Sequence, residues 1–451
     1  MANLAIAQQA GVTALATLQQ EFAIYCGNGA YGVVDLVTLR RNSTDRLAPR
    51  LVIFPRNEAN TLLRRRLETI GVPVATPKSV IEAYWVDPAT TVYDSITFTP
   101  NAVAATTLNL WVPPTISASP GPWSQVEDFL RETICANDLS LYEYLLNFLA
   151  HALQKPAEKP GVIIIFLGGQ GVGKGSVEAL LRRIWGSTTL LVNRVDLVIG
   201  SFNGVLERAF NVFLDEAVFY GDRRSTEALK SVVTSEYITI NEKHQPTRSI
   251  PSVHRFFAAS NSSHFAATDH DDRRAVYIHV SGERQGDHQY WDRVHAAISG
   301  DEAEHLTDFL LKRDISNFHP RQRPKSQELI RQRILSLTGF DQFWFELLRN
   351  VGPSVSEGHR MTPIEWEGDN FLATRTLLDQ YELFTKGTRA AYRTVGSHDL
   401  GEALRRMCPS ARQERRQVGG KRQHGYALPR LTIARAEFEQ YIGGAVTWPP
   451  E

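Results

Sequence analysis

The sequence is poor in cysteine, carries no net charge and has no long apolar run. Its 451 residues include three cysteines, Cys26, Cys135 and Cys408, which lie far apart and match no metal-ligand spacing. We expect these thiols to be buried, and so few of them suit a reducing compartment. The formal net charge of +0 gives no global reason to bind nucleic acid, so any such reason must be local.

Signals for a membrane or for secretion are also missing. No apolar stretch is long enough to span a bilayer, and the first residues lack the basic and apolar regions of a signal peptide. We therefore expect a cytoplasmic protein with no membrane partner. The length exceeds that of one compact domain, so two or three domains are expected.

A glycine-rich stretch is the strongest motif that is present. It follows the apolar run 162–167, which predicts a central parallel strand, and it precedes segment 177–185, which predicts an amphipathic helix. Glycines let backbone N–H groups approach phosphates closely, and a lysine supplies charge for the β- and γ-phosphates. We predict a nucleoside triphosphate site rather than a plain turn. The loop residues are Gly168, Gly169, Gln170, Gly171, Val172, Gly173, Lys174, Gly175 and Ser176.

The position after the loop lysine departs from the usual motif. A Ser or Thr hydroxyl there normally binds Mg²⁺, whereas this chain has Gly175 and carries its hydroxyl one residue later, on Ser176. Either Ser176 reaches the metal with a shifted geometry, or water replaces that ligand. We predict Ser176 and Asp215 as the metal ligands.

Two further apolar runs end in polar residues. Run 211–214 ends in Asp215 and Glu216, and run 255–260 ends in Asn261. Because ligands bind at the carboxyl ends of parallel strands, Asp215 would hold Mg²⁺ and Glu216 would polarise the attacking water. Asn261 would orient that water or contact the γ-phosphate. The plainer interpretation of the two acids, a favourable helix N-terminus, is less favoured once a phosphate loop stands in the same chain.

Downstream segments add basic residues. Alternating residues flank the polar segment 241–247, which predicts a β-hairpin whose tip carries Lys243 and His244. These two side chains could contact phosphate and sugar, although an isolated tip would more simply be a solvated turn. Arg273 and Arg274 precede another apolar strand, where arginine can stabilise transferring phosphoryl charge or merely pair with a nearby carboxylate.

Composition divides the chain into three predicted domains. Residues 1–120 form a mixed α/β accessory domain, with strands at 51–54 and 91–93 and a turn-rich linker at its end. Residues 121–315 form a helical lead-in and an α/β core with a parallel sheet, and residues 316–451 form a mostly helical domain. The last domain is locally basic, with the single acid Glu414 among Arg405, Arg406, Arg412, Arg415, Arg416, Lys421, Arg422 and Arg430.

The ordered set of motifs resembles the superfamily 3 DNA helicases of the AAA+ class, and most of all the helicase half of primase–helicases from phages, plasmids and large DNA viruses. The resemblance is specific over about 123–280. Besides the motifs above, it is carried by Asn109-Leu110-Trp111, by Ser201-Phe202-Asn203 with Leu206, and by Asp272-Arg273-Arg274.

The resemblance implies a P-loop ATPase that uses ATP and Mg²⁺ and assembles as a ring, a hexamer, with its sites between subunits. Lys174, Asp215, Glu216 and Asn261 would act within one subunit. Arg274, together with Arg273, would reach the nucleotide of the neighbouring subunit.

The resemblance also implies how DNA would be handled. Lys243 and His244 would line the central channel and track single-stranded DNA. The C-terminal domain would be winged-helix-like, and its basic cluster would contact duplex DNA or the emerging strand.

The leading hypothesis is an ATP-dependent DNA helicase, an ATP hydrolase that unwinds forked DNA during replication of a phage or mobile element in the cytoplasm of a bacterial host. The alternative is a P-loop ATPase that acts as a replication initiator or loader and remodels DNA without processive unwinding. A small-molecule kinase is a third possibility, against which the hairpin tip and the arginine pair argue. Since no primase signature is found, a primase or polymerase partner would be a separate chain or absent.

Overall fold

The computed structural model describes residues 2–41, 51–72, 77–216, 223–243, 245, 247–261, 274–350, 355–356, 359–360, 366, 370–387 and 395–449. The chain divides into two compact units, one of residues 1–265 and 273–324 and the other containing residues 325–451. The described residues of the predicted segments 1–120 and 121–315 thus lie in the same unit. Over the described residues, no helix has the length and apolar character that a membrane span requires.

The first unit begins with a small mixed sheet of strand order β3-β2-β1-β4. Its central hairpin turns at Asn28-Gly29, where both residues have positive φ (49° and 76°), as a two-residue type I′ turn requires. Helices α1, α3 and α4 bury an apolar core beside it. The elements are α1 (Ala2–Glu21), β1 (Phe22–Gly27), β2 (Ala30–Asp35), α2 (Leu36–Arg40), β3 (Phe54–Pro55), α3 (Arg56–Thr69), α4 (Pro77–Val86), β4 (Val92–Tyr93), β5 (Ser95–Thr97) and β6 (Thr107–Asn109).

The sequence predictions for the N-terminal strands and for the cysteines have different outcomes. The strand expected at 91–93 is confirmed as β4, whereas the run 51–54 pairs only from Phe54 onward, in β3. Cys135 and Cys408 are buried as predicted. The prediction for Cys26 is wrong, because it lies near the exposed end of β1.

A five-stranded parallel sheet forms the centre of the first unit. Its strand order is β13-β7-β12-β9-β8, and the strand β7 that precedes the glycine-rich loop is buried along its whole length. The apolar runs predicted as strands are thereby confirmed, since β-branched and aromatic residues fill a sheet covered on both faces. The strands are β7 (Ile163–Leu167), β8 (Thr189–Val192), β9 (Asn211–Leu214), β12 (Arg255–Ser260) and β13 (Ala275–His279).

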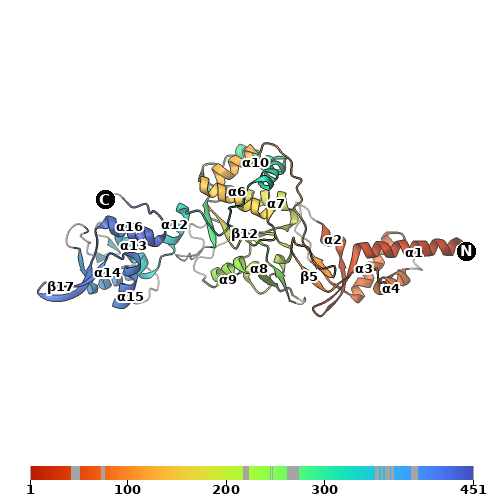
Figure 1. The fold of residues 1–451 in the computed structure, drawn as a ribbon, viewed down its shortest axis with the longest axis horizontal. Helices are drawn as coiled ribbons and strands as arrows, with labels where there is room; N and C mark the ends of the chain where they lie inside the picture. The colour runs from red at the N-terminus through yellow and green to blue at the C-terminus, as the bar shows by residue number, and fades with distance from the viewer. Residues whose placement is uncertain are drawn as a thin grey trace. The chain divides into compact units, whose positions relative to one another are not determined.

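Helices cover both faces of this sheet. In Figure 1, α6, α7 and α10 lie on one side of β12, and α8 and α9 lie on the other. Helices α10 and α11, which follow the last strand, pack on α7 and on α6 respectively. The helices are α5 (Ser124–Asp128), η1 (Phe129–Ile134), α6 (Leu139–Gln154), α7 (Lys174–Trp185), η2 (Gly186–Thr188), α8 (Asp196–Ile199), η3 (Gly204–Arg208), α9 (Arg223–Thr234), α10 (His288–Ser299) and α11 (Glu302–Lys312).

The predicted hairpin is present as β10 (Tyr237–Ile240) and β11 (Arg248–Pro251), which pair antiparallel with Ile240 opposite Arg248. Two asparagines anchor the base of its tip. The Asn241 N–H donates to Asn203 Oδ1 at 2.9 Å, and the Asn203 amide donates to the carbonyl oxygen of Thr239 at 2.9 Å. Asn203 belongs to the segment that carried the resemblance, and its side chain fixes this hairpin.

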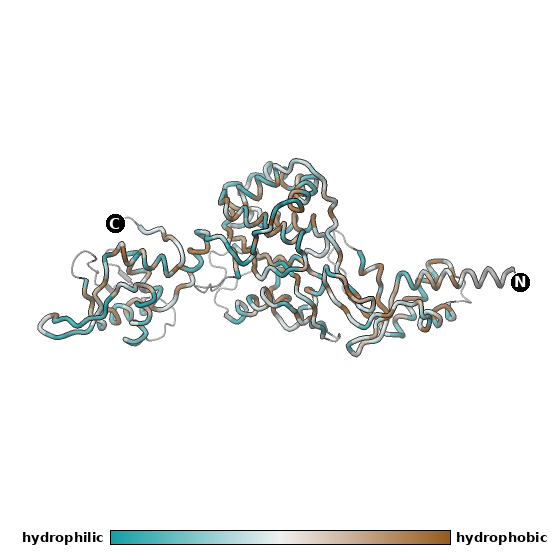
Figure 2. The backbone as a smooth tube through the Cα atoms, in the orientation of Figure 1, coloured by the Kyte–Doolittle hydropathy of each residue, from teal (hydrophilic) through white to brown (hydrophobic). Residues whose placement is uncertain are grey.

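The second unit contains two helices, three short strands, two more helices, a basic hairpin and a last helix in that order, around its own apolar core. Its sheet has the order β16-β18-β17, and Gly419 and Gly420 turn the long hairpin with positive φ. Figure 2 shows the tip of this hairpin as hydrophilic. The elements are α12 (Gln327–Leu335), α13 (Gly339–Arg349), β14 (Val355–Ser356), β15 (His359–Arg360), β16 (Phe371–Ala373), α14 (Thr374–Gly387), α15 (Ser397–Met407), β17 (Arg412–Val418), β18 (Lys421–Ala427) and α16 (Leu431–Ile442).

Candidate functional site

A cavity of about 440 Å³ opens at the carboxyl edge of the parallel sheet, where the glycine-rich loop joins β7 to α7. Three strands deliver the predicted residues to it. The loop follows β7, Asp215 and Glu216 follow β9, and Asn261 follows β12. The cavity is lined by Gln170, Gly171, Gly173, Lys174, Gly175, Ser176, Ala179, Asp215, Glu216, Asn261, Trp291 and His295.

The ammonium group of Lys174 is fully engaged inside the loop. Its Nζ donates to the carbonyl oxygens of Gly168 and Gly169, at 2.8 and 2.5 Å, and to Asn261 Oδ1 at 2.7 Å. The residue is only 9% exposed, and burial lowers the pKa of Lys174 from its ordinary value, while the carboxylates of Asp215 and Glu216 oppose that shift. A ligand oxygen at this position would have to replace acceptors that the protein itself provides.

Val172 packs beneath the backbone of the loop, next to Gly168. Its side chain is 2% exposed, and a Cβ placed on Gly168 would meet Val172 Cγ2 at 3.2 Å. Gly171 and Gly173 adopt positive φ of 76° and 96°, which an L side chain rarely adopts. The backbone path of the loop therefore depends on glycine at these positions.

Glu216 has an unusual backbone conformation. Its φ is +52°, in the left-handed region that few residues other than glycine, Asn and Asp occupy. Its N–H donates to Asp215 Oδ1 at 3.1 Å, so one carboxylate supports the turn that presents the other. Such backbone conformations cost about 1–3 kcal/mol and gather at functional sites.

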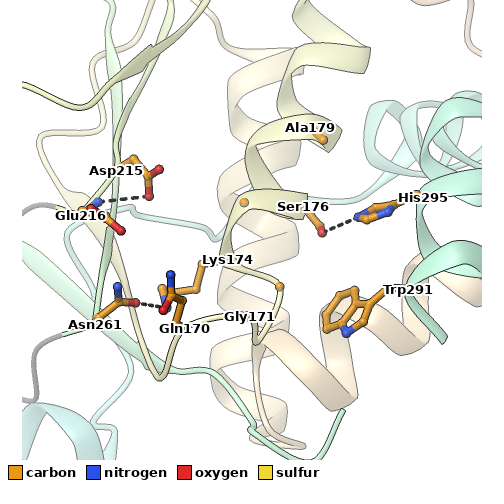
Figure 3. A pocket seen from close by; sticks show the side chains of 12 residues that line it. Gln170, Gly171, Lys174, Ser176, Ala179, Asp215, Glu216, Asn261, Trp291 and His295 are labelled. Carbon is orange, nitrogen blue, oxygen red and sulfur yellow. Dashed lines mark hydrogen bonds between the residues drawn. The ribbon is translucent and has the colours of Figure 1, made fainter. Parts of the chain in front are cut away.

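Ser176 is turned to the other side of the start of α7. Its Oγ lies 3.1 Å from His295 Nε2, and Figure 3 shows the hydroxyl directed toward His295, while Asp215 and Glu216 lie across the helix. The residue two positions earlier, Lys174, faces Asn261 in the same view. The predicted metal pair of Ser176 and Asp215 is thus split between the two walls of the cavity.

Two neighbouring glycines of the loop differ sharply in the space around them. A Cβ on Gly173 would lie 2.1 Å from Trp291 Cη2, so this ring packs directly on the loop backbone. A Cβ on Gly175 would meet no atom within 4 Å. At Gly175, where a hydroxyl side chain is usual, the structure therefore has room for a side chain.

Trp291 and His295 were not predicted from the sequence. Both belong to α10, more than a hundred residues after the loop, and they reach the cavity only because α10 packs on α7. Within the sequence they are part of an ordinary amphipathic helix. No local motif marks them.

The remaining predicted residues lie away from the cavity. Arg274 precedes β13, whose residue Ala275 pairs with Ile163 at the start of β7, so Arg274 lies at the amino edge of the sheet. The five residues of β7 separate that edge from the loop by roughly 16 Å. Lys243 is exposed in the tip of the β10–β11 hairpin. His244 and Arg273 lie outside the described residues.

The donor set suits a metal that arrives with a nucleotide. Over the described parts of the chain, no three His, Cys, Asp or Glu side chains gather as a ligand group. Mg²⁺ commonly keeps several waters and takes only one or two carboxylates together with substrate phosphates. The carboxylate of Asp215 beside Lys174 provides that kind of partial site.

Comparison with known proteins relates the chain to phage replication proteins. Residues 166–274 match a family of unknown function (DUF5906), and this segment holds the loop, both carboxylates, Asn261 and Arg274. The chain is similar to the DNA primase-polymerase of Nitratiruptor phage NrS-1, with 27% identity over 251 residues, 51% of this chain and 34% of that protein. The match thus spans about a third of the length of this relative.

The fold has a counterpart among solved structures. It is similar to the apo structure of the C-terminal region of NrS-1, with a TM-score of 0.62 and 17% sequence identity, over 92% of this chain and 97% of that one. The A form apo structure of the same region gives a TM-score of 0.62 over 92% of this chain and 98% of that one. At this identity the likeness concerns the fold.

Proposed function

We propose that this chain is the ATP-driven motor of a phage replication system, an AAA+ helicase that translocates on single-stranded DNA as a ring and unwinds forked DNA. The observation that carries the proposal is the convergence of Lys174, Asp215, Glu216 and Asn261 at one edge of the sheet. The parallel sheet β13-β7-β12-β9-β8 supports it, since ligands bind at the carboxyl ends of the strands in open α/β sheets. The phage relative supports the role in replication.

Each residue has a distinct part in ATP hydrolysis. Lys174 would exchange its contacts with Gly168, Gly169 and Asn261 for oxygens of the β- and γ-phosphates. Asn261, freed from the lysine, would orient the attacking water, and Glu216 would accept its proton. Asp215 would hold Mg²⁺, which neutralises charge on the phosphates when it is bound.

The position of Arg274 supports action between subunits. At the amino edge of the sheet it lies roughly 16 Å from its own loop, which is too far for a contact in cis. In a ring it would approach the nucleotide of a neighbouring subunit and stabilise the transition-state charge there. Lys243 in the exposed hairpin tip would contact the DNA strand.

The first experiment measures ATP hydrolysis with and without single-stranded DNA, and displacement of a strand from a fork. We expect Lys174→Ala to lower hydrolysis about 10²–10³-fold and to abolish displacement. Lys78→Ala, which removes a lysine that is 84% exposed, is the matched control and should change neither. Hydrolysis that ignores DNA but requires a small metabolite would refute the helicase and favour a kinase.

A mixing experiment tests the site between subunits. Lys174→Ala and Arg274→Ala chains should each be inactive. An equimolar mixture should recover about a quarter of the sites, because random assembly pairs an intact Lys174 with an intact Arg274 from the next subunit at that frequency. No recovery in a mixture that assembles normally would refute the assignment of Arg274 to the neighbouring nucleotide.

The second unit favours a second candidate, an initiator or loader that binds duplex DNA. The series α13, β16, α14, α15 and the β17–β18 hairpin would suit a winged-helix-like arrangement, with β14 and β15 inserted before β16. The hairpin presents Arg415, Arg422 and His424 on one face. Sequence-selective duplex binding without strand displacement would decide for this candidate. Strand displacement that needs Lys174 would decide for the helicase.

A further inference from the structure

Two aromatic side chains form the wall of the cavity that faces away from Asp215 and Glu216. Trp291 and His295 are four residues apart on α10 and so share one face of the helix. Their ring centroids are 6.3 Å apart with the planes inclined by 33°. Figure 3 shows both rings beside Ser176, across the start of α7 from Lys174 and Asn261.

The wall is held in place before any ligand binds. The indole N–H of Trp291 donates to the carbonyl oxygen of Arg284 at 2.9 Å, and its ring meets Phe129 edge to face, with centroids 6.2 Å apart. The His295 ring is held by the contact between its Nε2 and Ser176 Oγ. A preorganised aromatic surface loses little entropy when a ligand packs on it.

We infer that Trp291 and His295 receive the base of the nucleoside triphosphate. This inference rests on the proposed function, since it assigns the remainder of the same ligand. The phosphates belong with Lys174 and the carboxylates, so the nucleoside must extend along the other wall, past Ser176 and Ala179. Aromatic rings stack on any base, and purines, with two fused rings, offer the larger face. Ala179, which lines the same cavity further along α7, has only a small side chain.

The alternative is a purely structural role, in which Trp291 only supports the loop. Its ring fills the space beside Gly173, and its removal could loosen every phosphate contact. The two roles differ in one measurable respect. If Trp291 only supports the loop, its removal should weaken the binding of ligands with and without a nucleobase equally. If Trp291 receives the nucleobase, its removal should weaken the binding only of ligands that have one.

The test compares ATP with inorganic tripolyphosphate as ligands of the full chain, by calorimetry. We expect Trp291→Ala to weaken ATP about 5- to 150-fold, the equivalent of about 1–3 kcal/mol for a lost base stack, and to leave tripolyphosphate within about twofold. Trp291→Phe should restore most of the ATP affinity. Equal weakening of both ligands, or of neither, overturns the inference.

His295→Ala provides a second variant that changes an exposed side chain and keeps the tryptophan. It should also weaken the binding of ATP and leave the binding of tripolyphosphate unchanged. Tyr31→Ala, which removes an aromatic ring from the N-terminal sheet, should change neither affinity. The wild-type chain separates the two proposals. If it binds tripolyphosphate as tightly as ATP, the role of Trp291 and His295 in binding the nucleobase is refuted, while the proposed phosphate site stands. If it binds neither ligand, both proposals are refuted.

Discussion

Replacement of Gly173 by alanine tests the architecture of the loop most directly. Gly173 has φ +96° and ψ 8°, and an added Cβ would lie 2.1 Å from Cη2 and 2.6 Å from Cζ3 of Trp291. Two separate penalties therefore arise. One comes from the backbone conformation and the other from overlap with the ring.

The size of the two penalties can be worked from the structure. A non-glycine residue in such a backbone conformation costs about 1–3 kcal/mol. Insertion of a methyl group into a packed site costs about 1–3 kcal/mol more, and the ring cannot withdraw freely because its N–H is bonded to Arg284. We expect Gly173→Ala to lower the free energy of unfolding by about 2–6 kcal/mol and to abolish ATP binding. Urea unfolding followed by far-UV circular dichroism measures the first effect.

The control is the same substitution two residues later. An alanine at Gly175 meets no atom within 4 Å and lies in the first turn of α7. Because alanine is the better helix former, Gly175→Ala should raise stability by up to about 1 kcal/mol. The two glycine-to-alanine changes thus have opposite expected signs.

The double variant Gly173→Ala, Trp291→Ala separates the penalties. Removal of the ring should relieve the overlap, so the pair should be less destabilising than the sum of the single changes by about 1–3 kcal/mol. The backbone penalty should persist. A Gly173→Ala chain as stable as wild type, or strict additivity in the double variant, would refute the contact between this ring and the loop.

Three further predictions concern Mg²⁺, Asn261 and pH. Gly175→Ser should lower the Mg²⁺ concentration for half-maximal ATP hydrolysis, because it supplies the usual hydroxyl in open space; an unchanged magnesium titration would contradict this. Asn261→Ala should slow hydrolysis more than it weakens ATP binding, as measured by kcat and by the equilibrium Kd, since it removes the amide that would orient the attacking water under the proposed function but leaves Lys174. Burial, with help from Arg255, lowers the pKa of Lys159 to about 7, so its contribution to stability is greatest above its unfolded pKa of about 10.4 and declines as pH falls toward 7. Lys159→Met should remove that slope, up to about 1.4 kcal/mol per pH unit, from urea unfolding measured between pH 7 and 10; parallel curves for the two chains would contradict it.

The sequence predicts the sheet edge of the candidate site because the signals there are local. Each apolar run reveals a buried strand, and the residue after it must lie at the sheet edge where parallel strands end. Asp215, Glu216 and Asn261 follow β9 and β12, which neighbour each other in the sheet, so they meet Lys174 without further information.

The other wall of the cavity is hidden from the sequence because it depends on packing between distant elements. Helix α10 places Trp291 on Gly173 and His295 on Ser176, yet its apolar spacing reveals only a helix with one buried face. The direction of the Ser176 hydroxyl also depends on this packing between distant elements. Its residue type suggests a metal ligand, and only the position of His295 shows a competing partner.

Under the proposed function, these contacts connect the missing hydroxyl to the nucleotide site as a whole. Because Gly175 offers no side chain and Ser176 contacts His295, Mg²⁺ would depend on the carboxylates that line the cavity, with Asp215 as the proposed ligand. Positive charge near the γ-phosphate is also limited, because Lys174 alone among the cavity residues described here is a cation, with Arg274 at the opposite edge of the sheet. Under the proposed function, a single subunit therefore binds ATP but lacks a second cation for the transition state. A neighbouring subunit in the ring would supply it, which would couple hydrolysis to assembly.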